Sequence, residues 1–187
     1  MSKRTRILIL VNERAEGFYE RSTALGTLAA QTFLEEIHYR GSGALSDKDA
    51  KMFQSHRAQL TGLENIAETT LKVADVLDYI KKQIARPDRR GWREVHEGQR
   101  FGESLKNMIE RDLRTDVEYI CAKIHIGNDQ EEDMRDRQYI YLQLIRQLVR
   151  QVVVQYEYSV SERVSQRERE SWHDQRTGTG AHPTYQR

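Results

Sequence analysis

A chain of 187 residues is long enough for one domain with a buried core and short for two. Its 30 basic and 29 acidic residues nearly cancel, which excludes a global field that would steer the whole molecule to nucleic acid. The single cysteine, Cys121, excludes an internal disulfide framework and a multi-cysteine zinc site. No apolar run approaches the roughly 20 residues of a membrane span, so we expect a cytoplasmic protein without membrane contact.

The first helix is expected from about Thr5 to Tyr39, because apolar residues recur there every three or four positions along one face. Gly17 and Gly26 each weaken such a helix by roughly 1 kcal/mol relative to Ala, so it can bend or break at either position. Residues 7–11 alternatively fit a short buried strand. Because no confident partner strand is evident, we prefer the helix.

The second helix is expected from Ser46 to Ala85, with a length of about 60 Å at 1.5 Å per residue. Its apolar stripe is wider than the seam of a two-stranded coiled coil, which predicts packing against two neighbouring helices. Pro87 then ends the helix. The stripe follows two lines with a spacing of seven residues, Phe53, Leu60, Ala67 and Ala74, and Leu63, Thr70, Leu77 and Ile84.

Two further helices are expected, from Phe101 to Ile124 and from about Gln130 to Arg169. Cys121 falls on the apolar face of the first of them, which predicts a buried small side chain. We therefore predict an all-α fold, a bundle of four long antiparallel helices over residues 1–173. The polar residues 174–187 are expected to form a flexible tail.

Residues 137–156, within the fourth predicted helix, contain no Asp or Glu. One face of this acid-free segment is apolar, and Tyr141 and Tyr156 belong to it, which predicts a core position for both tyrosines. The opposite face carries only arginines and glutamines, including Arg146 and Arg150. Such a face suits an anionic or polar partner, or else an interface inside the fold.

A basic segment covers residues 81–93, where six cations stand against one acid, Asp88. Lysine and arginine side chains contact phosphates without reading sequence, and Trp92 can stack on a base. Arginine is also favoured in protein interfaces, so a protein partner fits the same segment. The candidate nucleic-acid-binding residues are Lys81, Lys82, Arg86, Arg89, Arg90, Trp92, Arg93, Arg146 and Arg150.

Arg90 and His96 have the spacing of the arginine and histidine in HEPN-type ribonucleases, which are also helical bundles. In that family the two residues lie near the start of a helix, and paired copies across a dimer form the RNA-cleaving site. The resemblance covers these two residues, and Gly91 stands where the family usually has a polar residue. It implies the alternative of a helical ribonuclease.

Metal binding and cofactor binding are not expected. Glu35 and His38, and Glu170 and His173, have the three-residue spacing of di-iron bundle ligands, but the predicted topology places the two pairs at opposite poles. We find no phosphate-binding glycine loop, nucleophile elbow or zinc protease motif.

The sequence therefore favours a non-enzymatic helical subunit or adaptor that docks into a larger protein or nucleoprotein assembly. In size, helicity and its two basic surfaces the chain is similar to the small helical subunits of CRISPR effector complexes, which line a bound nucleic acid with basic side chains. A homo-oligomer built through the long second helix is a further alternative.

Overall fold

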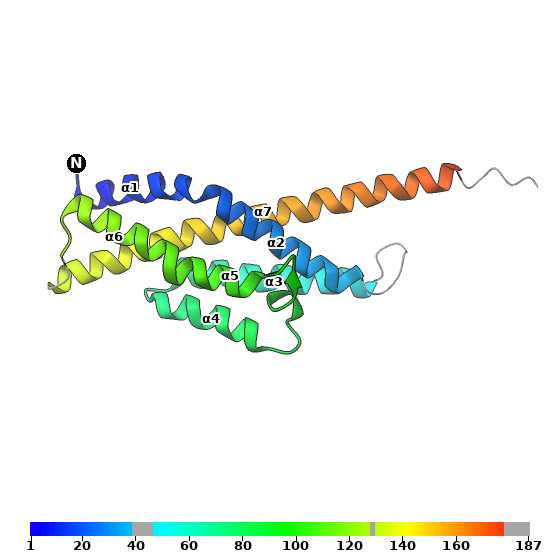
Figure 1. Cartoon of the computed structure of the whole chain (residues 1–187), viewed down its shortest axis with the longest axis horizontal. Coiled ribbons are helices and arrows are strands. Elements are labelled where there is room, and N and C mark those ends of the chain that lie inside the picture. Colours follow the sequence, from blue (N-terminus) through cyan, green and yellow to red (C-terminus); the bar gives the residue numbers. More distant parts are fainter. Residues whose placement is uncertain (39–46, 128–129, 178–187) are drawn as a thin grey trace, which may run out of the picture.

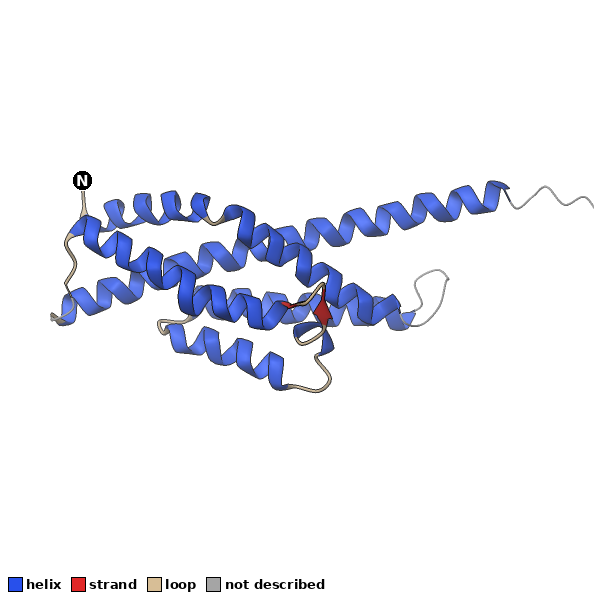
Figure 2. Cartoon of the chain, viewed as in Figure 1, coloured by secondary structure: helices blue, strands red, loops and turns tan. Residues whose placement is uncertain are grey.

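The computed structural model describes residues 1–38, 47–127 and 130–177, and most of these residues are helical (Figure 2). The all-α class is therefore confirmed. The elements in chain order are α1 (Lys3–Gly17), α2 (Tyr19–His38), α3 (Asp47–Thr69), α4 (Val73–Ala85), the 3-10 helix η1 (Arg90–Trp92), β1 (Val95–His96), β2 (Gln99–Arg100), α5 (Phe101–Asn107), the π-turn η2 (Met108–Asp112), α6 (Leu113–Ile124) and α7 (Glu131–Thr177).

Helix α7 runs along the length of the molecule, and the other helices pack around it (Figure 1). It contacts α1, α2, α3, α4 and α6. Helices α3 and α4 form a hairpin that covers only one part of the bundle, and α4 lies on its outside against α5. The C-terminal part of α7 extends past the other helices (Figure 1).

The first predicted helix is two helices, α1 and α2. Residues 7–11 lie within α1, and Ile7 and Val11 are buried, so the strand alternative is wrong. The helix breaks next to Gly17, at Phe18, whose backbone is non-helical and whose side chain is buried in the core. It does not break at Gly26, because there α2 packs against α7.

The prediction of one continuous helix from residue 46 to residue 85 is wrong, because the chain turns between α3 and α4. At the turn, the backbone N–H of Lys72 donates to the Thr70 hydroxyl at 3.0 Å, and this hydroxyl also bonds to Asp75 at the start of α4. Threonine hydroxyls compete with helical hydrogen bonds in this way. The predicted apolar lines describe the buried face of α3 but not that of α4. Leu60, Leu63 and Ala67 are buried, whereas Ala74 is exposed and α4 buries Val76 and Ile80 instead.

The third predicted helix forms as α5, the π-turn and α6. The last predicted helix is confirmed as α7, which continues to Thr177, past the expected start of the tail at residue 174. The rest of that tail, residues 178–187, lies outside the described residues. The notion of four uninterrupted antiparallel helices is thus replaced by a bundle with a kinked first member and a folded-back second member.

The core is apolar and contains an aromatic cluster. Phe33 stands at its centre, with ring centroids 6.2 Å from Trp92, 5.7 Å from Phe101 and 5.8 Å from Tyr156. Cys121 is buried as expected, and this burial raises the pKa of its thiol above the ordinary value.

Candidate nucleic-acid interface

Arg146 of the acid-free segment is used inside the fold. Its guanidinium donates to the backbone carbonyl of Ala67 at 2.9 Å, and to those of Glu68 at 3.2 Å and Thr70 at 3.4 Å. These carbonyls lie at the C-terminus of α3, where backbone acceptors lack intrahelical partners and the helix dipole favours a cation. Arg146 thus caps α3, and only 18% of its side chain is exposed.

Arg150 lies one turn further along α7 and is bound to the same end of α3. Its guanidinium forms an ion pair with Glu68 at 3.0 Å, although 56% of its side chain remains exposed. Glu68 of α3 thus supplies the negative charge that pairs with Arg150, since the acid-free segment has no acid of its own. Both arginines that the sequence offered as phosphate ligands on α7 contact protein.

Three glutamines of the same segment bond to α1 and α2, and the first, Gln147, donates to Asn12 of α1 at 3.5 Å. Gln151 accepts a hydrogen bond from Ser22 at 2.6 Å, and Gln155 donates to Thr27 at 3.3 Å. A Cβ atom on Gly26 would lie 2.6 Å from both the Gln155 Cβ and the Val152 carbonyl oxygen, so α2 and α7 meet closely here. Uncharged amides suit such a contact, because buried carboxylates would need paired cations.

Of the two α7 tyrosines that were expected in the core, Tyr156 is buried and Tyr141 is only partly buried. Tyr156 is 3% exposed, and burial raises its pKa to about 12. Tyr141 is half-buried and donates its hydroxyl to the Ile109 carbonyl, while Tyr158 is exposed. The acid-free segment therefore packs against several neighbouring helices, although Arg150 and Val154 remain exposed.

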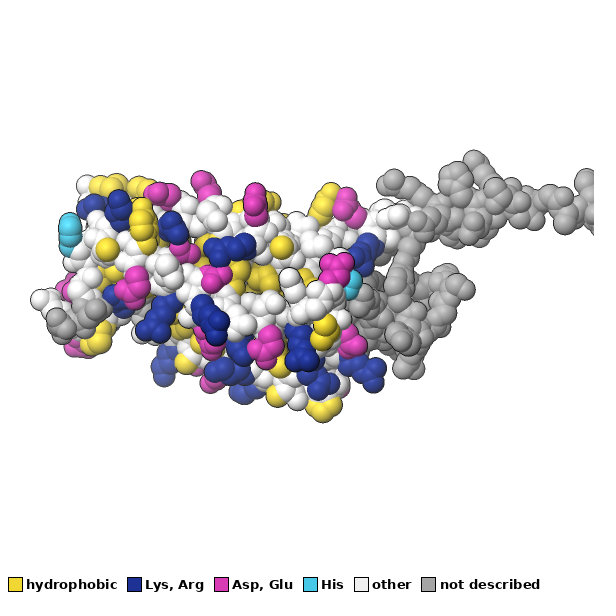
Figure 3. Space-filling model, in the orientation of Figure 1, with side chains coloured by type: hydrophobic (Ala, Val, Ile, Leu, Met, Phe, Trp, Pro, Cys, Tyr) yellow, Lys and Arg dark blue, Asp and Glu magenta, His cyan; other side chains and the backbone are white. Residues whose placement is uncertain are grey.

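The basic segment, residues 81–93, lies instead at the outer end of α4 and in the connector that follows. Figure 3 shows cations gathered on the side of the molecule where Figure 1 places α4, with acidic side chains between them. Pro87 follows shortly after the end of α4 and lies in a turn, as expected for a residue that cannot continue a helix. The connector then folds back through η1 onto α2 and α5.

Trp92 is the member of this segment that the structure places in the core. It is fully buried, packs on Phe101 and donates its indole N–H to the Gln59 side-chain oxygen at 2.7 Å. It therefore cannot stack on a bound base, and that proposed role is wrong. Gly91 beside it is also buried, because a Cβ there would lie 1.8 Å from the Phe33 ring.

Three of the six cations in the basic segment have polar partners. Arg89 donates to the Ser55 hydroxyl at 3.0 Å and pairs with Asp88 at 3.4 Å. Arg93 donates to the Pro87 carbonyl at 3.0 Å, and Lys81 lies 4.0 Å from Asp78.

The other three cations, Lys82, Arg86 and Arg90, are exposed, and within the described part of the chain no side chain or carbonyl pairs with them. We call these three residues the free basic cluster. These three cations are exposed and have no ion-pair partner, whereas Arg146 and Arg150 of α7 are bound to α3.

Arg90 and His96 are not arranged as the ribonuclease resemblance implies. Arg90 opens the 3-10 helix η1, whereas His96 lies in β1 of a two-stranded hairpin. The hairpin turns through Glu97 and Gly98, both with positive φ, a geometry typical of two-residue hairpin loops. The two residues therefore do not share the start of a helix.

The carboxylate and histidine pairs fall where the structure describes no side chains, at residues 34–38 and 167–177. Among the side chains that are described, no cluster of three or more His, Cys, Asp or Glu residues has the geometry of a metal site. None of the described helices combines the length and the apolar character that crossing a lipid bilayer requires.

Comparison with known proteins gives no match to this chain, whether among family models, curated proteins or solved structures.

Proposed function

We propose that the chain is a non-enzymatic helical subunit of a cytoplasmic nucleoprotein assembly, in which the free basic cluster contacts nucleic-acid phosphates. The observation that carries the proposal is the exposure of Lys82, Arg86 and Arg90, with which no described acid forms an ion pair. Cations that are already bound to protein have little to gain from a phosphate. Cations that face water without a partner release counterions from a polyanion when they bind it.

The buried position of Trp92 sharpens the kind of contact that is proposed. With its only tryptophan in the core, the basic segment offers guanidinium and ammonium groups and no exposed aromatic platform. Such groups bind the backbone and position a partner without distinguishing bases. The proposed binding is therefore independent of sequence and strongly dependent on salt.

The remaining partners from the sequence hypotheses are a protein surface, a second copy of the chain and an RNA substrate. Arginines at a helix end also suit an acidic protein surface. The ribonuclease alternative keeps Arg90 and His96 as its site, although the structure separates them between η1 and β1. A binding experiment distinguishes these alternatives from the proposal.

The experiment measures fluorescence anisotropy of a labelled single-stranded RNA over a series of salt concentrations. The test variant carries Lys82→Gln, Arg86→Gln and Arg90→Gln. Removing three phosphate contacts lowers the slope of log affinity against log salt by about 2, since each contact contributes roughly 0.7 for a single strand. Because the three residues are exposed and unpaired, we expect the free energy of unfolding to change by less than about 0.5 kcal/mol.

The matched control neutralises Arg21, Arg57 and Arg135, three exposed arginines on α2, α3 and α7. The net charge falls by the same amount in both variants, so a local phosphate site affects only the first. Equal losses in the two variants contradict the proposal, and so does the absence of RNA binding by the unmodified chain. RNA cleavage that disappears in His96→Ala supports the ribonuclease alternative instead.

A further inference from the structure

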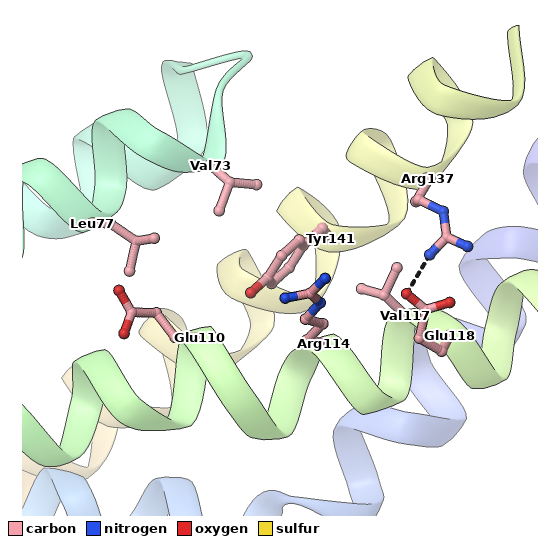
Figure 4. A pocket seen from close by; sticks show the side chains of 8 residues that line it. All are labelled: Val73, Leu77, Glu110, Arg114, Val117, Glu118, Arg137 and Tyr141. Atoms are coloured by element: carbon pink, nitrogen blue, oxygen red, sulfur yellow. Dashed lines mark hydrogen bonds and ion pairs between the residues drawn. The ribbon is translucent and has the colours of Figure 1, made fainter. Parts of the chain in front are cut away.

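A groove lies between α4, the π-turn with α6, and α7, with a volume of about 740 Å³ (Figure 4). Its apolar wall consists of Val73 and Leu77 from α4, Val117 from α6 and the ring of Tyr141 from α7. Four charged side chains complete the lining, Glu110, Arg114, Glu118 and Arg137. The groove lies at the α3–α4 turn end of α4, whereas the free basic cluster lies at its other end.

The π-turn and Tyr141 hold this groove in shape. The backbone N–H of Leu113 donates to the carbonyl of Met108, five residues back, which widens the helix by one residue. The nearby carbonyl of Ile109 accepts the Tyr141 hydroxyl at 2.5 Å. This bond joins the π-turn to α7 across the base of the groove, so the groove is part of the packed fold.

Two of the four charged groups neutralise each other. Arg137 donates to Glu118 at 2.5 Å, and this hydrogen bond holds the pKa of the Glu118 carboxyl below its ordinary value (Figure 4). Glu110 and Arg114 differ, because no described residue forms a hydrogen bond or an ion pair with either of them. The groove therefore presents one unpaired anion and one unpaired cation, about one helical turn apart.

An apolar side chain protrudes beside the apolar hollow. Leu71 is 80% exposed in the turn between α3 and α4, two residues before the groove residue Val73. The Leu71 carbonyl accepts a hydrogen bond from the Gln138 side chain at 2.6 Å, which ties the turn to α7. Leu71 thereby extends the apolar surface that Val73, Leu77 and Val117 form in the groove, and a continuous exposed apolar patch is typical of an association surface.

We propose that a second copy of this chain covers this face in a two-fold symmetric dimer. A two-fold interface uses the same surface on both copies, so that surface must complement itself. Leu71 of each copy enters the groove of the other, and Arg114 of each copy pairs with Glu110 of the other. An acidic or basic protein partner requires an excess of one charge, whereas this groove carries one unpaired charge of each sign.

The proposal is independent of the phosphate contact. It assigns a different surface, because the groove residues Val73 and Leu77 lie at the start of α4 and the free basic cluster lies at and beyond its end. A variant that is monomeric but still binds RNA, or dimeric but without RNA binding, separates the two proposals.

The experiment measures the dissociation constant of the dimer by sedimentation equilibrium. Arg114→Glu places two acids opposite each other at each contact, and Glu110→Arg places two cations there. We expect each variant alone to weaken the dimer at least tenfold. An equimolar mixture of the two variants restores association as a one-to-one heterodimer, because each contact then joins opposite charges.

Two further variants control this result. Leu71→Ser removes the protruding side chain at an exposed position, and we expect it to weaken the dimer while the helical content measured by circular dichroism stays unchanged. Arg111→Glu reverses an exposed charge in the π-turn that does not line the groove, and we expect it to leave the dissociation constant within about twofold of the unmodified chain.

A monomer at every accessible concentration overturns the proposal. So does a dimer that is insensitive to both charge reversals, since another face then forms the interface. Failure of the mixed variants to associate, when each variant alone is monomeric and folded, overturns the proposed pairing of Arg114 with Glu110.

Discussion

The acid-free segment of α7 and the basic segment at the end of α4 are both rich in cations and poor in acids. The polar groups of the first contact neighbouring helices, whereas three cations of the second face solvent. In α7, Arg146 and Arg150 bind the end of α3, and the glutamines bond to α1 and α2. In the basic segment, Lys82, Arg86 and Arg90 face solvent. The polar face of the acid-free segment is thus matched by protein groups, whereas these three cations of the basic segment have no ion-pair partner among the described residues.

Trp92 gives the strongest test of this comparison, because it is the buried residue of the otherwise exposed basic segment. Trp92→Ala removes a fully buried side chain and its hydrogen bond to Gln59, and we expect a loss of about 3–5 kcal/mol in the free energy of unfolding. Urea denaturation followed by circular dichroism measures this loss. Arg90→Ala, two residues earlier, is the control, with an expected change within about 0.5 kcal/mol.

A stable Trp92→Ala protein that has lost affinity for single-stranded RNA contradicts the core position and restores the tryptophan as a stacking residue.

Arg146 and Arg150 test whether the cations of α7 serve the fold. Arg146→Met keeps most of the aliphatic stem but leaves three carbonyls at the end of α3 without their charged donor. We expect destabilisation by roughly 2 kcal/mol, as for hydrogen bonds to charged groups. Arg150→Met breaks a half-exposed ion pair and is expected to cost less than about 1 kcal/mol.

Both values come from denaturant unfolding of the two variants under identical conditions. If Arg146→Met unfolds like the unmodified chain and only its RNA affinity falls, Arg146 belongs to the binding surface and the contrast between the two segments fails.

The close crossing of α2 and α7 gives a smaller effect at Gly26. Gly26→Ala places a methyl group 2.6 Å from the Val152 carbonyl oxygen, and we expect destabilisation by about 1–3 kcal/mol from the forced backbone shift. Gly17→Ala is the matched control, because its Cβ meets no atom within 4 Å. There we expect no loss and a gain of up to about 1 kcal/mol from helix propensity.

Thermal or urea unfolding of both alanine variants measures the contrast. Equal responses at the two glycines argue against a tight α2–α7 contact and reopen the face of α7 that carries the glutamines.

The local spacing of apolar residues in the sequence determined most of the helices. The period of three to four residues predicts the helices and their buried faces, including Val11, Phe33 and Cys121, because burying one face of a helix constrains only residues near in sequence. Pro87 marks the end of the hairpin for the same local reason. The sequence also predicts the exposed cations of residues 81–93, because charged side chains at the end of a helix can face water without contacting a distant segment.

Only the tertiary structure decided which polar groups are already bound. Arg146 caps the end of α3, although it lies 79 residues from Ala67 along the chain. The seven-residue spacing of apolar residues continues across the turn, so the sequence pattern does not indicate that the helix ends there. Trp92 is buried because it packs on Phe101 and donates a hydrogen bond to Gln59, although the charged composition of its segment predicts a surface position. The groove with Glu110 and Arg114 exists because the α3–α4 hairpin, the π-turn and α7 meet there, and contacts between distant segments have no local period.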